Sequence, residues 1–225
     1  IDRDPELGGV CLNRGCIPSK ALLHISKVMN ETSHLEKMGV TYGDPEIDLN
    51  VVQTHKNKIV SQLNSGIAQL AKARKVETLQ GLASFVSNTE LKVKTGTGDI
   101  PITFNQCIIA AGSTSAMIPG IPSEHPSVLT SRTALDLEDV PERLLVIGGG
   151  VIGLEIGQVY ATFGSSVSVV EFLPNLLPGT DPDLVKPLQR KLKKQFELIL
   201  VSSKVTKAEL TDDETLTVTI KNDNG

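Results

Sequence analysis

A Gly-rich loop between an apolar strand and a helix constrains the fold more than any other stretch of the chain. Residues 144–147 predict a buried strand, and a helical pattern follows the loop as far as Gly164. A second apolar strand over 167–170 ends at Glu171. The loop has the spacing G-x-G-x-x-G, at Gly148, Gly150 and Gly153. Strand, loop, helix, strand and terminal acid in this order predict a βαβ dinucleotide-binding unit.

The same residues predict which dinucleotide this unit binds. Glycines permit the tight turn, and the N-terminus of the helix takes the pyrophosphate. Glu171 would accept hydrogen bonds from the ribose hydroxyls and would repel a 2′-phosphate. The unit is therefore predicted to bind NAD rather than NADP.

A pair of cysteines is the second informative feature. Cys11 and Cys16 lie five positions apart in a Gly-rich segment, directly before an apolar-patterned run. The pattern predicts a loop that carries Cys11 and a helix from near Cys16 to about Met38, with Pro18 in its first turn. A thiol at a helix N-terminus is favoured as thiolate. The pair predicts a redox-active dithiol, and two unrelated buried cysteines are the alternative.

The sequence around these cysteines resembles that of a known protein family. The run Cys-Leu-Asn-Arg-Gly-Cys-Ile-Pro-Ser-Lys-Ala-Leu-Leu over 11–23 resembles the active-site signature of the pyridine nucleotide–disulfide oxidoreductases, which are flavoproteins. It is most similar to the branch that oxidises protein-bound dihydrolipoyl groups with NAD. Val10 stands where the family normally has Thr, and Arg14 where it usually has Val. A related glutathione or mercuric reductase is the alternative.

This resemblance implies a catalytic relay. The cysteine matching Cys11 exchanges with the substrate, and the one matching Cys16 faces the flavin. The lysine matching Lys20 lies beside the flavin and pairs with the glutamate matching Glu155. Electrons would pass from a dithiol substrate to the Cys11–Cys16 disulfide, then to FAD and then to NAD. The implied catalytic residues are Cys11, Cys16, Lys20 and Glu155.

The resemblance also implies contacts to both cofactors. Asp2, at the end of a truncated strand, would bind the adenosine ribose of FAD, and a solvated terminus is the alternative. Residues 106–113 predict a buried strand with Cys107 in the core. The expected FAD contacts are Asp2, Gly9, Val10, Cys11, Lys20, Ala83, Ala111, Gly112 and Ser113. The expected NAD contacts are Gly148, Gly150, Gly153, Glu155, Glu171 and Val205.

The fold class expected is α/β, with two Rossmann-like three-layer domains of which the first is truncated. The expected divisions are 1–118 for FAD, a Pro-rich linker over 119–141, and 142–225 for NAD, incomplete at its end. Hydrophobic periodicity predicts further helices over 50–75 and 181–196, and strands over 76–81, 90–94, 100–104, 198–210 and 215–221. In the 50–75 helix, Lys56 belongs to the polar side. Hairpin turns are predicted over 96–99 and at Gly225.

The resemblance also implies segments outside this chain. The first FAD glycine loop would precede Ile1, and an interface domain with a His-Glu base would follow Gly225. A third, non-enzymatic interpretation is therefore that this segment alone is an inactive nucleotide-binding piece.

Composition excludes several other classes of protein. The net charge of the 225 residues is −4, which argues against a nucleic-acid surface. No apolar run approaches the ~18 residues that span a bilayer, and no metal site is predicted. Three cysteines are too few for a secreted disulfide scaffold. The resemblance implies a cytoplasmic or mitochondrial-matrix homodimer that serves lipoyl domains of 2-oxo acid dehydrogenase complexes or the glycine cleavage system.

Overall fold

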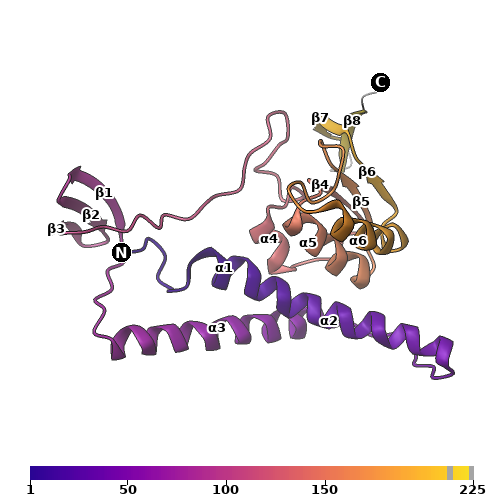
Figure 1. Cartoon of the computed structure of the whole chain (residues 1–225), viewed down its shortest axis with the longest axis horizontal. Helices are drawn as coiled ribbons and strands as arrows, with labels where there is room; N and C mark the ends of the chain where they lie inside the picture. Colours follow the sequence, from indigo (N-terminus) through magenta and orange to yellow (C-terminus); the bar gives the residue numbers. More distant parts are fainter. Residues whose placement is uncertain (212–214, 223–225) are drawn as a thin grey trace. The chain divides into compact units, whose positions relative to one another are not determined.

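The computed structural model describes residues 1–211 and 215–222 (Figure 1). The chain divides into two compact units, which we describe separately. The first comprises residues 1–18 and 57–114, and the second comprises 19–56 together with the chain from 115 onward. Residues 19–56, which the sequence groups with the first domain, therefore pack with the second unit.

The second unit contains a parallel sheet with the strand order β4-β5-β6. Helices connect its strands, as Figure 1 shows. The elements are β4 (Arg143–Ile147), α5 (Val151–Phe163), β5 (Ser166–Val170), α6 (Pro182–Gln195) and β6 (Leu198–Leu200). Helix α5 ends where Gly164 adopts a φ of 117°, a left-handed conformation that suits glycine. The predicted strand–loop–helix–strand unit is thus confirmed.

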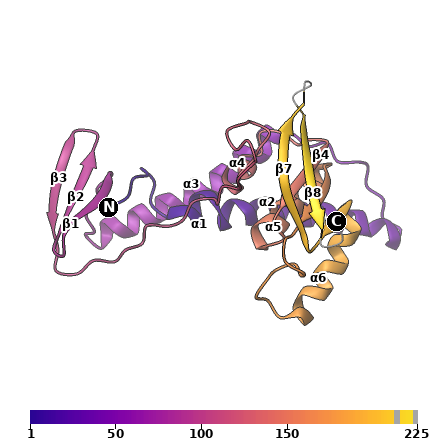
Figure 2. The same ribbon diagram turned by 90° about the horizontal axis from the view of Figure 1, so that it is seen from above.

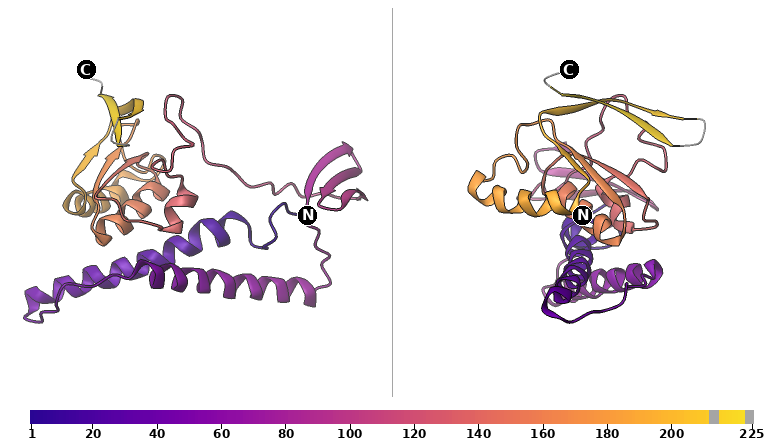
Figure 3. Two further views of the ribbon diagram at one scale, coloured as in Figure 1. Left: turned by 180° about the vertical axis from the view of Figure 1, so that it is seen from behind. Right: turned by 90° about the vertical axis from the view of Figure 1, so that its right-hand side faces the viewer.

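A two-stranded antiparallel ribbon follows this sheet (Figure 3). Its strands are β7 (Ser203–Leu210) and β8 (Leu216–Asn222). The single strand predicted over 198–210 is therefore two strands, because β6 joins the parallel sheet and β7 the ribbon. The second predicted strand is confirmed, and the turn predicted at Gly225 lies outside the described residues.

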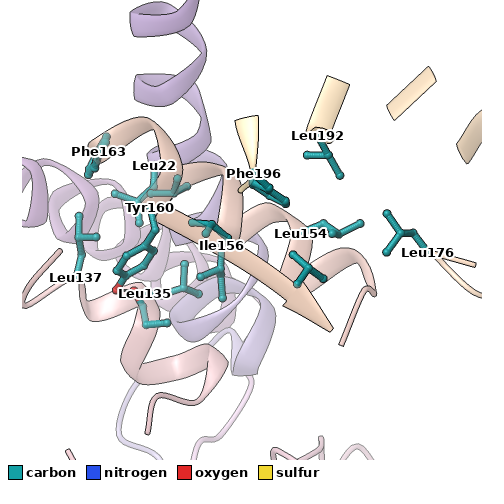
Figure 4. Packing of buried hydrophobic residues seen from close by; sticks show 14 of the residues in the cluster. Leu22, Leu135, Leu137, Leu154, Ile156, Tyr160, Phe163, Leu176, Leu192 and Phe196 are labelled. Atoms are coloured by element: carbon teal, nitrogen blue, oxygen red, sulfur yellow. Dashed lines mark hydrogen bonds between the residues drawn. The ribbon is translucent and has the colours of Figure 1, made fainter. Parts of the chain in front are cut away.

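The hydrophobic core of the second unit joins four helices to the sheet. Helix α2 (Cys16–Leu35) contributes Leu22, which is 1% exposed. Figure 4 shows Leu22 close to Tyr160 of α5, and Leu135 of the short helix α4 (Ser131–Asp136) close by. Helix α6 contributes Leu192, which is fully buried. This packing fixes the first half of α2 against α5.

Side chains from two other helices satisfy the carbonyl groups at the end of α4. The hydroxyl of Tyr160 donates to the Ala134 oxygen at 2.9 Å. Helix α3 (Leu49–Ala73) supplies Lys56, whose Nζ donates to the Leu135 oxygen at 2.6 Å. Lys56 is only 4% exposed, so its assignment to the polar side of the helix was wrong. Burial lowers the pKa of Lys56, although the nearby Asp136 carboxylate opposes this shift.

The first unit contains a three-stranded antiparallel sheet with the order β1-β2-β3 (Figure 2). Its strands are β1 (Leu82–Ser87), β2 (Glu90–Thr95) and β3 (Gly98–Thr103). The hairpin between β2 and β3 and both of its strands are confirmed. The strand predicted over 76–81 was wrong, because this segment pairs only at Gln80, in an isolated parallel bridge with Asp2. The Asp2 N–H donates to the Leu79 oxygen at 3.1 Å, and the Gly81 N–H donates to the Asp2 oxygen at 2.8 Å.

Two further predictions for the first unit were wrong. Cys11 lies in a short helix, α1 (Gly9–Arg14), and not in a loop, although the next helix does begin at Cys16. Residues 106–113 are exposed and form no strand, with Ile108 91% exposed and Cys107 also exposed. The physical reason is that, within the described part of the chain, no strand pairs with this segment.

The long helices were also predicted correctly. The helix expected from Cys16 to about Met38 is α2 followed by a 3-10 turn, η1 (Glu36–Met38). The helix expected over 50–75 is α3. Among the residues described, no helix has the length and apolar character that crossing a membrane requires.

The Gly-rich loop gives a first prediction. A Cβ atom on Gly153 would collide with the Gly148 carbonyl oxygen and approach Val146 Cγ1 to 2.9 Å, whereas one on Gly66 in α3 would meet nothing within 4 Å. We expect Gly153→Ala to lower the free energy of unfolding by about 1–3 kcal/mol. Gly66→Ala should raise it by roughly 0.5–1 kcal/mol. Urea unfolding measures both, and a Gly153→Ala protein as stable as the parent would contradict the close approach.

The buried tyrosine gives a second prediction. Burial, with the Asp139 and Asp136 carboxylates adding to it, raises the pKa of Tyr160 to about 12. Below pH ~10 both the folded and the unfolded chain keep the phenol proton. Above that pH the unfolded chain releases it while the folded chain still holds it, so stability falls until about pH 12.

The Tyr160→Phe variant isolates this effect. It should be less stable than the parent near neutral pH by about 1 kcal/mol, because the hydrogen bond to Ala134 is lost. Its stability should then fall less steeply above pH ~10, by a difference on the order of 2 kcal/mol. Unfolding measured at several pH values tests this, and parallel curves for the two proteins would contradict the raised pKa.

Candidate dinucleotide and dithiol site

The Gly-rich loop of the second unit leaves open space at two of its glycines. Gly148 has a φ of 109°, and neither Gly148 nor Gly150 would bring a Cβ atom within 4 Å of any neighbour. Gly150 is the N-cap of α5 and has no side chain that could accept a hydrogen bond from the N–H groups of the first turn. Backbone N–H groups at such a helix start favour an anion such as pyrophosphate. The loop therefore fits the dinucleotide predicted for it.

Glu171 lies at the end of β5 and holds this loop in place. Its Oε2 accepts the Gly149 N–H at 2.7 Å, and its Oε1 accepts the Leu173 N–H at 2.7 Å. The side chain is buried, with 7% exposed. Each carboxylate oxygen has a further lone pair, so a role toward ribose hydroxyls remains open to it. The sequence predicted the ribose role but missed this bracing of the loop.

Lys20 and Glu155 form the ion pair that the resemblance implied. Lys20 Nζ lies 2.6 Å from Glu155 Oε1. The other carboxylate oxygen, Oε2, accepts the hydroxyl of Ser19 at 3.2 Å. Ser19 is buried, Glu155 is 22% exposed and Lys20 is 58% exposed. The pair joins α2, the helix that begins at Cys16, to α5, the helix that begins at the Gly-rich loop.

The dithiol segment in the first unit is folded tightly on itself. A Cβ atom on Gly15 would lie 3.0 Å from the Val10 oxygen and 3.3 Å from Cys11 Cα. Gly15 therefore lies close to the backbone of Val10 and Cys11, where a side chain would fit only if these neighbours shifted. Both cysteines are exposed, and none of the three cysteines, all of them described, is in a disulfide.

The residues expected to contact FAD are only partly gathered. In the first unit, a Cβ atom on Gly112 would lie 3.9 Å from Val10 Cγ2, so these two segments meet. The backbone of Asp2 bridges Gln80, and its Oδ1 accepts the Asp4 N–H at 3.0 Å. Val10 and Gly112 thus lie near each other within the first unit. Three other residues expected to contact FAD, Ala83, Ala111 and Ser113, are exposed. Val205, which is expected to contact NAD, is buried in β7.

The structure also adds residues that the sequence did not indicate. Ser19, next to Lys20, was not singled out as a partner of Glu155. Asn13 and Asn64 lie beside the dithiol and are hydrogen-bonded to each other at 2.8 Å. Asn64 stands 51 residues away from its partner, and no local sequence pattern marks it. In the described ranges, no group of three His, Cys, Asp or Glu side chains is placed so that it could hold a metal ion.

The bracing role of Glu171 gives a third prediction. Glu171→Ala would leave the N–H groups of Gly149 and Leu173 without their acceptor, at a cost of about 1–3 kcal/mol each. Glu171→Gln keeps one acceptor oxygen and should lose less. Urea unfolding ranks the three proteins, and a Glu171→Gln protein as stable as the parent would contradict a role for both carboxylate oxygens.

Comparison with known proteins identifies the family. The family model for pyridine nucleotide-disulphide oxidoreductases matches residues 3–225. The chain is 43% identical over 213 residues to a dihydrolipoyl dehydrogenase of Vibrio cholerae, covering 95% of this chain and 45% of that protein. It is 38% identical over 223 residues to a mitochondrial dihydrolipoyl dehydrogenase of Dictyostelium discoideum, covering 98% of this chain and 46% of that protein. The chain thus spans about half the length of the curated relatives it matches.

Solved structures agree with this assignment. The HOCl-induced flavoprotein disulfide reductase RclA of Escherichia coli superposes with a TM-score of 0.78 at 27% identity, covering 97% of this chain and 46% of that one. LpdA of Mycobacterium tuberculosis has the same fold, with a TM-score of 0.85 at 20% identity over 97% of this chain and 48% of that one. With its α/β, Rossmann-like architecture, the chain belongs to the pyridine nucleotide-disulphide oxidoreductase family.

Proposed function

We propose that this chain is the redox and NAD-binding part of a dihydrolipoyl dehydrogenase. In this proposal the Cys11–Cys16 disulfide oxidises protein-bound dihydrolipoyl groups, with FAD and NAD as cofactors. The observation that carries it is the Lys20–Glu155 ion pair at 2.6 Å. It ties the helix that begins at the second cysteine to the helix that begins at the dinucleotide loop, which a chance pair of motifs would not do.

The thiol chemistry belongs to the chain's own cysteines. A substrate thiolate attacks the Cys11 sulfur of the disulfide and forms a mixed disulfide, and Cys16 leaves as thiolate. The second substrate thiol then displaces Cys11, so the substrate becomes a disulfide as the protein becomes a dithiol. Bound FAD would accept the two electrons and bound NAD would carry them away as hydride.

Lys20 and Glu155 serve this chemistry by their charges. The Lys20 cation, one helical turn after Cys16, would favour a thiolate at Cys16 and negative charge on a nearby reduced cofactor. Glu155 holds the lysine in one position and is itself held by Ser19. The residues proposed to bind NAD are Gly148, Gly150, Gly153, Glu155, Glu171 and Val205. The residues proposed to bind FAD are Asp2, Gly9, Val10, Cys11, Lys20, Ala83, Ala111, Gly112 and Ser113.

The relatives support the choice of substrate and partner. Bacterial and mitochondrial proteins 38–44% identical to this chain carry the name dihydrolipoyl dehydrogenase. The proposed partners are therefore lipoyl domains of 2-oxo acid dehydrogenase complexes or of the glycine cleavage system. We propose a homodimer in the cytoplasm or the mitochondrial matrix for the protein at full length.

A related disulfide reductase is the second candidate function. The observation in its favour is the 27% identity to a flavoprotein disulfide reductase of Escherichia coli. Glu171 disfavours the NADP-linked members, because a carboxylate repels the 2′-phosphate.

Turnover assays separate the two candidates and give a fourth prediction. The protein that carries this chain at full length should oxidise dihydrolipoamide with NAD, and Cys11→Ser or Cys16→Ser should abolish this activity. Cys107→Ser, which removes the third, exposed cysteine, should leave it unchanged. This chain alone, which spans about half the length of its relatives, should show no turnover. Reduction of glutathione disulfide with NADPH instead would contradict the proposed substrate.

A further inference from the structure

One partly buried polar contact in the first unit involves the segment between Cys11 and Cys16 and has no role assigned above. Asn64 Nδ2, from helix α3, donates to Asn13 Oδ1 at 2.8 Å. Asn64 is 9% exposed, and Asn13 stands between Cys11 and Cys16 in the chain. The contact therefore links a distant helix directly to the segment that connects the two thiols.

Asn13 passes this link on to the backbone around Cys11. Its Nδ2 donates to the Gly9 oxygen at 3.0 Å and lies 3.3 Å from the Leu7 oxygen, also as donor. The Asn13 amide, which follows Cys11 in the chain, thus holds the backbone of Leu7 and Gly9, which precede it. Asn13 can donate to these carbonyl oxygens only when its Nδ2 points toward them. Its Oδ1 then points toward Asn64, whose Nδ2 is the donor.

Helix α1 needs such support because it is too short to be stable by itself. It has six residues, and its N-cap, Gly8, gives no side-chain hydrogen bond. A helix of this length is unstable in isolation, so contacts from outside must fix its conformation. The contacts that do so are the Asn64–Asn13 hydrogen bond, the Arg14–Asp4 ion pair at 3.0 Å and the buried Leu12.

Packing alone does not explain an asparagine at position 64. Its Oδ1 is buried and, among the described residues, has no hydrogen-bond partner. A buried acceptor without a donor is unfavourable for stability, and a leucine of similar size would avoid it. Packing therefore does not account for the Asn64 amide, and the side-chain hydrogen bond found for it among the described residues is the one to Asn13.

We propose that Asn64 is a positioning residue for the Cys11–Cys16 dithiol and acts through Asn13. The segment is held in a conformation in which Gly15, the neighbour of Cys16, lies close to the backbone of Cys11: a Cβ atom on Gly15 would be 3.3 Å from Cys11 Cα. Holding it there keeps the two cysteines near each other, which raises the effective concentration of one thiol at the other and favours the intramolecular disulfide. The inference rests on the proposed function, in which this dithiol is redox-active. It concerns the thiol–disulfide equilibrium of the chain and needs no bound cofactor.

The test measures this equilibrium in the 225-residue chain with Cys107→Ser as background. Glutathione disulfide is the oxidant: two cysteine thiols and one glutathione disulfide give one protein disulfide and two glutathione molecules. After equilibration in glutathione buffers, alkylation and mass spectrometry count dithiol and disulfide. Asn64→Leu should lower the equilibrium constant by about three- to tenfold, the worth of one hydrogen bond. A tenfold change corresponds to about 30 mV in reduction potential.

Asn30→Leu is the matched control. It removes an asparagine of α2 whose side chain makes its hydrogen bonds within the second unit. Its Nδ2 donates to Thr162 Oγ1 at 3.0 Å and to the Ser26 oxygen at 2.7 Å, and its Oδ1 accepts from Gln195 Nε2 at 3.5 Å. This variant loses tertiary hydrogen bonds to Thr162 and Gln195, so its thermal stability should fall at least as far as that of Asn64→Leu. Its thiol–disulfide equilibrium should stay within about twofold of the parent, because hydrogen bonds lost within the second unit do not loosen α1.

Two further variants keep the inference testable if Asn64→Leu does not fold. Asn64→Ser keeps a polar group that is too short to reach Asn13, and it should shift the equilibrium in the same direction. Asn13→Ala should shift it at least as far. The double variant Asn64→Leu with Asn13→Ala should go no further than Asn13→Ala alone, because the first residue acts through the second.

The outcomes separate this inference from the proposed function. A parent chain in which Cys11 and Cys16 form no disulfide would contradict the proposed function, and the inference with it. A parent that forms the disulfide while the Asn64 variants leave its equilibrium within about twofold would overturn the inference alone. An equal shift in Asn30→Leu would also overturn it, since the effect would then be general loss of stability.

Discussion

The packing of α2 against α5 is the interaction on which the chemistry of this chain depends. Leu22 is nearly fully buried between the helices, and burial of a leucine stabilises by about 1.5–3 kcal/mol. The Lys20–Glu155 pair beside it adds less, because Lys20 is more than half exposed to water. Apolar packing therefore holds the helices together, and the ion pair with Ser19 sets the position of the charges.

Polar groups at the Gly-rich loop and at the dithiol hold the backbone in similar ways. At the loop, Glu171 accepts N–H groups from Gly149 and Leu173. At the dithiol, Asn13 donates to carbonyl oxygens on the far side of Cys11. In both places a glycine allows a close approach, and a side chain then fixes the backbone. Short segments that lack long regular structure become rigid in this way, and rigidity is what a ligand site requires.

The sequence predicts well those parts of the fold that depend on neighbours in the chain. The βαβ unit is identified because its glycines, apolar strands and terminal acid follow one another directly. The Lys20–Glu155 pair, 135 residues apart, came from the family resemblance and not from any local pattern. Lys56 was predicted to be exposed because helical periodicity shows only which residues share a face of the helix. It does not show that another part of the chain, here α4, packs against that face. The Asn13–Asn64 bond has no local signal at all.

The segment over 106–113 shows that apolar composition alone does not predict burial. Its apolar run has the composition of a buried strand, and Ile108 and Ile109 are nevertheless exposed. A strand is buried by the strands and helices that flank it, and composition alone cannot provide them. The same holds for Cys107, which was expected in the core and is exposed.

Anaerobic titration with dihydrolipoamide, followed by absorption spectroscopy, tests the central claim most directly. The claim is that Cys11 and Cys16 form a redox disulfide next to a bound flavin. In the full-length protein, addition of one equivalent should produce a long-wavelength band, as expected when a thiolate lies against an oxidised flavin. Cys16→Ser should lack the band, and Cys107→Ser should retain it. Bleaching of the flavin without such a band, or a protein without flavin, would contradict the claim.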